Sequence, residues 1–176
     1  MRPPYPLILA LLCLGPSHSV LATQTCHDSV IALTPDDHFT VHGDGTVTHM
    51  RTGLMWKQCA EGLSGDDCAT GAAAVYNWKD ALAQAEGLTF AGHSDWRLPN
   101  VKELRSLVEE RCHSPAINAT VFPGTPTASE GYFRASSQYA NSGSHAWLVG
   151  FDGGRVNYGS RGQSTSRYVR LVRSPQ

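Results

Sequence analysis

Two polar stretches near the end of the chain carry residue types that bind ligands. Residues 138–146 (QYANSGSHA) and 157–167 (NYGSRGQSTSR) are rich in tyrosine, asparagine, serine, glycine and arginine. Aromatic anchors among small polar groups are typical of adaptable binding loops, although plain solvated hairpin loops share this composition and remain an alternative. The residues that we predict to contact a ligand are Tyr139, Asn141, Tyr158, Arg161 and Arg167.

A second candidate is the junction DWRLPNVKEL, where a tryptophan and an arginine run directly into a predicted helix start. Such a pair can hold a sugar ring and an anionic group. However, large aromatic side chains mainly supply buried area, and Arg97 can pair with Glu103 or Glu109. Asp95 would point to the opposite face of an extended segment. We therefore favour a structural corner over a ligand site.

The local pattern explains how this corner forms. Asn100 is a natural N-cap, and Glu103 follows three residues later, which is the capping-box pattern. Pro99 keeps the residue before it extended. The residues of the predicted corner are Trp96, Arg97, Pro99, Asn100 and Glu103.

Four cysteines follow the first 22 residues, and an even number in an exported chain favours two disulfides. Cys59 and Cys68 bracket a loop rich in glycine and aspartate, so we predict that they form a local pair. Cys26 and Cys112 then pair by elimination. A zinc site is the alternative, but the sequence has no CxxC spacing to support it.

Patterns for metal binding and catalysis are weak. His38 and His42 would share one face of a strand, with His49 on the returning strand, but no carboxylate or cysteine completes a metal site by spacing. The sequence has no G-x-S-x-G elbow, no phosphate loop and no H-E-x-x-H motif. We therefore expect no enzymatic activity, no catalytic residue, no bound metal and no cofactor.

Charge is distributed unevenly along the chain. Residues 131–176 contain six arginines and one acidic residue, whereas residues 23–130 contain seven lysines and arginines and fourteen acidic residues. A cationic segment of this kind can attract anionic partners. Alternatively, these arginines neutralise the acidic part of the same chain, and we slightly favour that explanation.

Periodicity predicts an α+β fold. Glycines within residues 39–48 indicate a hairpin, and apolar residues at helical spacing predict helices that begin after Asn77 and Asn100. The later segments YFRASSQY, HAWLVGF, RVNYG and RYVRLVR indicate an antiparallel meander. We expect two helices packed on a twisted antiparallel sheet, stabilised by disulfides.

The chain begins like an exported protein. A short basic start, an apolar run and small residues near position 22 predict a signal peptide over residues 1–22. We expect a lead-in over residues 23–37 and one domain over residues 38–176. The product is expected in the periplasm or outside the cell, with no integral membrane span and no nucleic-acid partner.

Several motifs in this order resemble the Lcl C-terminal domain family, named for the C-terminal domain of a Legionella collagen-like adhesin. They are DGTVTHMRTGLMWKQC, AGHSDWRLPNVKELRSLVE, YFRASS, AWLVGFDGG and RYVRLVR. The resemblance implies an exported bacterial domain with a layout similar to C-type lectins and sulfatase-modifying factors. The family's namesake binds sulfated polysaccharides, but no collagen-like stalk precedes the domain in this sequence.

From these features we expect a secreted adhesion domain that recognises a glycan, including anionic or sulfated polysaccharides, or a protein surface through its C-terminal loops. One alternative is an enzyme or enzyme accessory related to sulfatase-modifying factors, which rests on fold analogy. Another is a structural subunit of a cell-surface assembly. The sequence does not define the oligomeric state.

Overall fold

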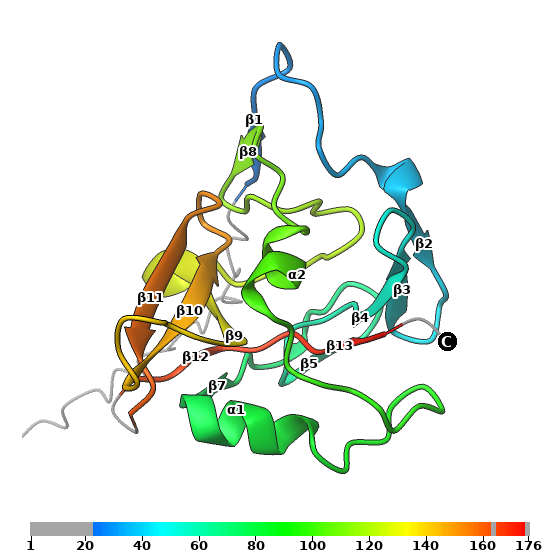
Figure 1. The fold of residues 1–176 in the computed structure, drawn as a ribbon. Coiled ribbons are helices and arrows are strands. Elements are labelled where there is room, and N and C mark those ends of the chain that lie inside the picture. Colours follow the sequence, from blue (N-terminus) through cyan, green and yellow to red (C-terminus); the bar gives the residue numbers. More distant parts are fainter. Residues whose placement is uncertain (1–22, 163–164, 175–176) are drawn as a thin grey trace, which may run out of the picture.

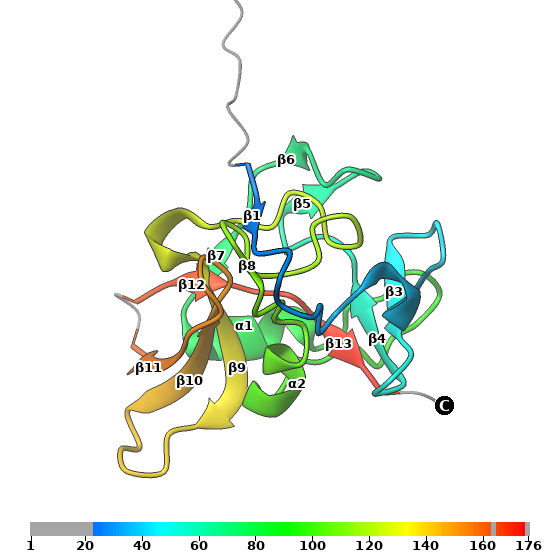
Figure 2. The same cartoon turned by 90° about the horizontal axis from the view of Figure 1, so that it is seen from above.

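The computed structural model describes residues 23–162 and 165–174, so the predicted signal peptide lies outside the described residues. The expected α+β class is confirmed, because α1 (Trp78–Ala85) and α2 (Val101–Arg105) accompany mostly antiparallel strands. The two larger sheets lie on either side of α2 (Figures 1 and 2). One side of α2 therefore faces the protein interior, and the other side lies at the surface.

The larger sheet has the strand order β11-β10-β9-β12-β7. Every pairing in it is antiparallel except that of β12 with β9. Its strands are β7 (Val75–Tyr76), β9 (Tyr132–Gln138), β10 (His145–Gly150), β11 (Val156–Ser160) and β12 (Arg167–Tyr168).

The second sheet has the order β13-β4-β3-β2 and contains the predicted hairpin. Gly43 and Gly45 in its turn have φ angles of 74° and 83°, the left-handed region that glycine adopts without steric cost. The strands of this sheet are β2 (Phe39–Val41), β3 (Thr46–His49), β4 (Leu54–Lys57) and β13 (Val172–Arg173).

The closing segment RYVRLVR differs from the predicted single meander, because it contributes one strand to each sheet. Tyr168 in β12 lies beside Phe133, whereas Val172 in β13 lies beside Trp56. Val169 and Leu171, between these strands, are fully buried. The segment therefore ties the two sheets together across the core, as its path in Figure 1 shows.

Both predicted helices form, each with the expected cap. The Asn77 side chain accepts a hydrogen bond from the Asp80 backbone N–H at the start of α1. Asn100 and Glu103 form a complete capping box at the start of α2. Apolar residues continue at helical spacing to Leu107 and Val108, but α2 ends at Arg105, because the N–H groups of these two residues donate to carbonyls three residues back, those of Leu104 and Arg105, rather than four back.

Both predicted disulfides are present, Cys26–Cys112 and Cys59–Cys68. The first joins β1 (Thr25–Cys26) to β8 (Cys112–His113), and the second lies beside the small ribbon of β5 (Leu63–Ser64) and β6 (Thr70–Gly71). Two 3₁₀ turns complete the fold, η1 (Asp36–His38) and η2 (Ala128–Gly131).

Candidate functional site

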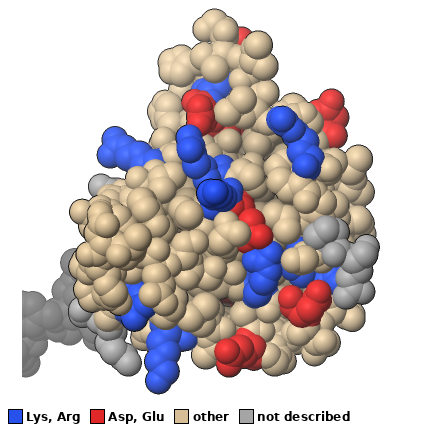
Figure 3. Space-filling model, viewed as in Figure 1, with Lys and Arg blue, Asp and Glu red and all other residues tan. Residues whose placement is uncertain are grey.

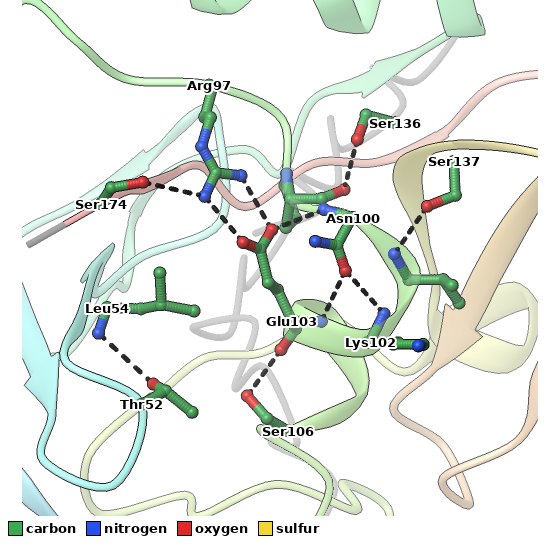
Figure 4. A network of polar contacts seen from close by, with 12 residues as sticks. Thr52, Leu54, Arg97, Asn100, Lys102, Glu103, Ser106, Ser136, Ser137 and Ser174 are labelled. Atoms are coloured by element: carbon green, nitrogen blue, oxygen red, sulfur yellow. Dashed lines mark hydrogen bonds and ion pairs between the residues drawn. The ribbon is translucent and has the colours of Figure 1, made fainter.

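The predicted corner is a closed polar network (Figure 4). The Arg97 guanidinium donates two hydrogen bonds to the Glu103 carboxylate, at 2.8 and 2.7 Å. The same carboxylate accepts the backbone N–H of Asn100 at 2.8 Å. Burial alone would raise the pKa of Glu103, but the hydrogen bonds from Arg97 and Asn100 outweigh it and hold that pKa below its usual value.

Neighbouring residues anchor the corner in the fold. Trp96 is buried with Leu98, Val169 and Leu171, and its indole N–H donates to the carbonyl of Phe90 at 3.0 Å. The geometry therefore places Trp96 in the interior rather than in a sugar-binding groove. Asp95 turns away from the Arg97–Glu103 pair, as expected, and accepts a hydrogen bond from Arg173.

A cluster of aromatic side chains lies on one face of β10 and β11, beside the loop that follows β9. The rings of Tyr139 and Tyr158 are stacked, with centroids 4.2 Å apart and planes inclined by 4°. Trp147 meets both rings edge-on, at 5.2 and 6.4 Å, and His145 lies 5.7 Å from Tyr158. We call Tyr139, His145, Trp147 and Tyr158 the aromatic shelf.

The sheet register brings the shelf together. Trp147 on β10 is directly opposite Tyr158 on β11, so their side chains share one face of the sheet. The loop after β9 then returns toward β10, where the Tyr139 N–H donates to the carbonyl of His145 at 3.0 Å. Tyr158 is 47% exposed, so this side chain is available to a ligand.

The same loop surrounds the shelf with hydrogen-bonding groups. The Asn141 amide contacts the Tyr139 hydroxyl at 3.3 Å, and Ser142 and Ser144 lie 2.8 and 3.0 Å from the His145 ring nitrogen Nδ1. Of the five predicted ligand residues, the structure therefore brings together Tyr139, Asn141 and Tyr158.

A shallow groove of about 190 Å³ continues from the shelf toward α2. Val101, Trp147 and Val156 form its apolar lining, and Lys102 and Arg105 contribute positive charge. In the space-filling view, basic side chains lie over the middle of this face (Figure 3). Trp147 belongs to both the shelf and the groove, which makes them one continuous surface.

The side chains of the two predicted ligand arginines are directed away from the shelf, although the Arg161 backbone N–H donates to the carbonyl of Ser144, in the loop beside the shelf, at 2.9 Å. The Arg161 guanidinium packs 4.4 Å from the ring centroid of Trp78, which opens α1. Arg167 is half-buried, donates to the carbonyl of Ser166 and lies 6.0 Å from the Tyr132 ring. Neither residue has a described contact with the shelf.

Three other C-terminal arginines are buried within the scaffold: Arg134, Arg170 and Arg173. Arg170 donates to the carbonyls of Lys57 and Gln58 and to the hydroxyl of Thr125. Burial lowers the pKa of Arg170 to about 9. The cationic sequence segment therefore does not form one cationic surface, and its arginines bind carbonyl groups more often than carboxylates.

The predicted histidine positions are divided between environments. His42 contacts the hydroxyl of Thr48 at 2.8 Å, whereas His49 is buried and stacks on Phe39 with centroids 4.7 Å apart. Burial lowers the pKa of His49, and the charges of His38 and Arg51 lower it further. Within residues 23–162 and 165–174, no group of three His, Cys, Asp or Glu side chains is placed to hold a metal ion.

Sequence patterns did not single out Trp147 and His145 as shelf residues or Lys102 and Arg105 as groove residues. The turn residues Asp152–Gly154 could have indicated Trp147, because a hairpin centred on this turn pairs Trp147 with Tyr158. Lys102 and Arg105 have no local signal, since only tertiary packing brings α2 beside β10.

These features define a disulfide-stabilised α+β domain with an aromatic surface site bordered by basic residues. The model of the Lcl C-terminal domain family matches residues 45–173, and the chain belongs to that family. It therefore carries an adhesin-associated domain. A search of curated proteins found no match to the chain.

The structural context is consistent with an oxidising environment outside the cytoplasm, where disulfides form and persist. In the part of the chain that the structure describes, no helix has the length and apolar character needed to cross a membrane.

Proposed function

We propose that this domain is a non-enzymatic adhesion module that recognises a glycan through the aromatic shelf. The observation that carries the proposal is the stacked pair Tyr139 and Tyr158 beside Trp147, at a surface with exposed hydrogen-bonding groups. The C–H faces of pyranose rings pack on aromatic side chains, while the sugar hydroxyls bond to amides, imidazoles and phenols. Asn141 and His145 supply such groups at the edge of the shelf.

Charge supports an anionic glycan, including sulfated polysaccharides. Lys102 and Arg105 line the groove that continues from Trp147. A sugar stacked on the shelf can therefore extend an anionic substituent toward these two cations. In this proposal the positive charge comes from α2 rather than from Arg161 and Arg167.

The disulfides favour binding over the alternative of sulfatase-modifying chemistry. All four cysteines of the described chain form disulfides, so none supplies a free thiol there. A C-type-lectin-like layout is part of the same proposal.

The test compares two double variants that remove equal charge from different places. Lys102→Ala/Arg105→Ala should weaken binding to a heparin-like polymer, and the loss should shrink as salt rises because exposed charges are screened. Arg161→Ala/Arg167→Ala should bind nearly as well as the wild type. Loss of binding in the second variant alone would assign the anion site to the C-terminal arginines instead.

The stacking component needs a separate variant. Tyr158→Ala should abolish most binding on a glycan array, while far-UV circular dichroism should be unchanged and the unfolding free energy should fall by only about 1 kcal/mol, because the side chain is half-exposed and loses mainly its stacking on Tyr139. Unaltered glycan binding by Tyr158→Ala would refute the shelf as the recognition site. Binding to proteins but to no glycan would favour a protein surface as the ligand.

A further inference from the structure

The loop that follows β1 exposes apolar side chains to solvent. It spans residues 27–33 and projects at the top of Figure 1. Ile31 is 86% exposed, and Val30 and Leu33 are 46% and 44% exposed. Contiguous exposed apolar side chains often mark an interaction site. We call residues 27–33 the apolar finger.

The base of the finger is fixed by several independent contacts. The Cys26–Cys112 disulfide closes it on one side, where the His27 N–H also donates to the carbonyl of Arg111 at 2.9 Å. On the other side, the Glu109 carboxylate accepts the N–H groups of Leu33 and Thr34 at 3.2 and 2.8 Å. A loop held in this way loses little conformational freedom on binding, which favours a docking role.

A mostly apolar groove lies at the other end of β1, beside the residue that precedes the strand. Its volume is about 510 Å³. Gln24, which precedes β1, borders this groove and donates to the carbonyl groups of Pro115 and Ile117 at 2.8 and 2.7 Å. All of its lining residues are uncharged, and the apolar ones include Pro115, Ala119, Phe122, Pro123 and Pro126. We call it the proline groove.

We propose that two copies of this chain associate by placing the finger of each in the proline groove of the other. The tip Val30–Leu33 is apolar, and the groove lining is uncharged and mostly apolar, so docking of the tip desolvates no charged side chain of the tip or the lining. Both features adjoin β1, on either side of Cys26, and a two-fold axis would make the two finger-to-groove contacts of such a pair equivalent.

Charge disfavours a lipid surface as the partner. Residues 23–37 contain three acidic residues and no lysine or arginine. Anionic membranes attract basic segments, and an acidic lead-in would be repelled. A second copy, with its uncharged groove, has no such conflict.

The experiment is sedimentation velocity on the purified protein from about 1 µM to about 1 mM, the range in which a small apolar interface associates. The wild type should show a reversible monomer–dimer equilibrium. Val30→Asp should raise the dissociation constant about tenfold or more, because it places a charge in the apolar groove. Val41→Asp is the matched control, since Val41 is 49% exposed but lies on β2, and it should dimerise like the wild type.

A groove variant tests the reciprocal geometry. Ala119→Asp should also weaken association, and its mixture with Val30→Asp should form heterodimers with an intermediate dissociation constant, since one intact finger then meets one intact groove. A monomer at every concentration would overturn the proposal, as would equal association of Val30→Asp and Val41→Asp. Vesicle binding lost only in Val30→Asp would identify a lipid partner and also overturn it.

This association is independent of glycan recognition. The finger and groove share no residue with the aromatic shelf, so Tyr158→Ala should dimerise normally. Each proposal can therefore fail without affecting the other.

Discussion

Replacement of Glu103 by alanine tests the corner that positions α2. The substitution removes two hydrogen bonds from Arg97 and the capping bond from the Asn100 N–H. Because the Arg97 side chain is 38% exposed, solvent screening limits the ion pair to about 1 kcal/mol. The lost capping bond adds about 0.5–1 kcal/mol. The free energy of unfolding should therefore fall by about 2 kcal/mol, or about 4–8 °C in Tm for a chain of this size.

The assay is urea unfolding at neutral pH, followed by circular dichroism. Arg97→Ala and the double variant Arg97→Ala/Glu103→Ala complete a cycle, and the coupling energy between the two side chains should be about 1 kcal/mol. Arg105→Ala is the control. Its contact with Glu110 is 3.4 Å long and joins two exposed side chains, so unfolding should change by less than about 0.5 kcal/mol.

Glycan binding by the Glu103→Ala protein separates the two interpretations of the corner. At a temperature where the variant is fully folded, binding should stay within about threefold of the wild type, which corresponds to less than about 0.7 kcal/mol. A variant that unfolds like the wild type but no longer binds would refute the structural interpretation and make the corner a ligand site.

Two further predictions concern pH and the disulfides. The pKa of His49 in the folded protein lies below 6.5, so on acidification this histidine is protonated at a higher pH in the unfolded chain than in the folded one. The unfolding free energy should be constant above about pH 7 and fall as pH drops through about 6, and His49→Phe should flatten urea midpoints across this window. The disulfides close loops of unequal length, with sequence separations of 86 and 9 residues. Cys26→Ser/Cys112→Ser should therefore cost about 4–5 kcal/mol and Cys59→Ser/Cys68→Ser about 2–3 kcal/mol, and equal losses in denaturant titrations would contradict the chain-entropy account.

Features set by short-range chemistry could be predicted from the sequence. The hairpin around Gly43 and Gly45 depends on positive φ angles, and both helix starts depend on asparagine side chains within one turn. The disulfide pairing followed because one pair is close in sequence and only one combination remained. In each case the deciding contacts lie within the segment itself or leave a single alternative.

Features set by long-range packing could not be predicted. The spacing of RYVRLVR indicates strands, but nothing in it shows that Tyr168 joins one sheet and Val172 the other. Tyr139 lies in the loop after β9, whereas Tyr158 lies on β11, and the two rings stack only because β9, β10 and β11 are aligned in this register.

Arginine content is a poor guide to surface charge in this chain, and the reason is physical. Carbonyl oxygens at strand ends need donors when they are buried, and a guanidinium group offers five N–H bonds in a fixed geometry. Arg134 fills this role for Tyr76 and Ser160, and Arg170 fills it for Lys57 and Gln58. Positive charge at the shelf comes instead from α2, inside the part of the sequence with excess acidic residues. Charge counts along the chain point to arginine side chains that the structure directs away from the shelf, whereas the cross-strand position of Trp147 leads to the groove that Lys102 and Arg105 border.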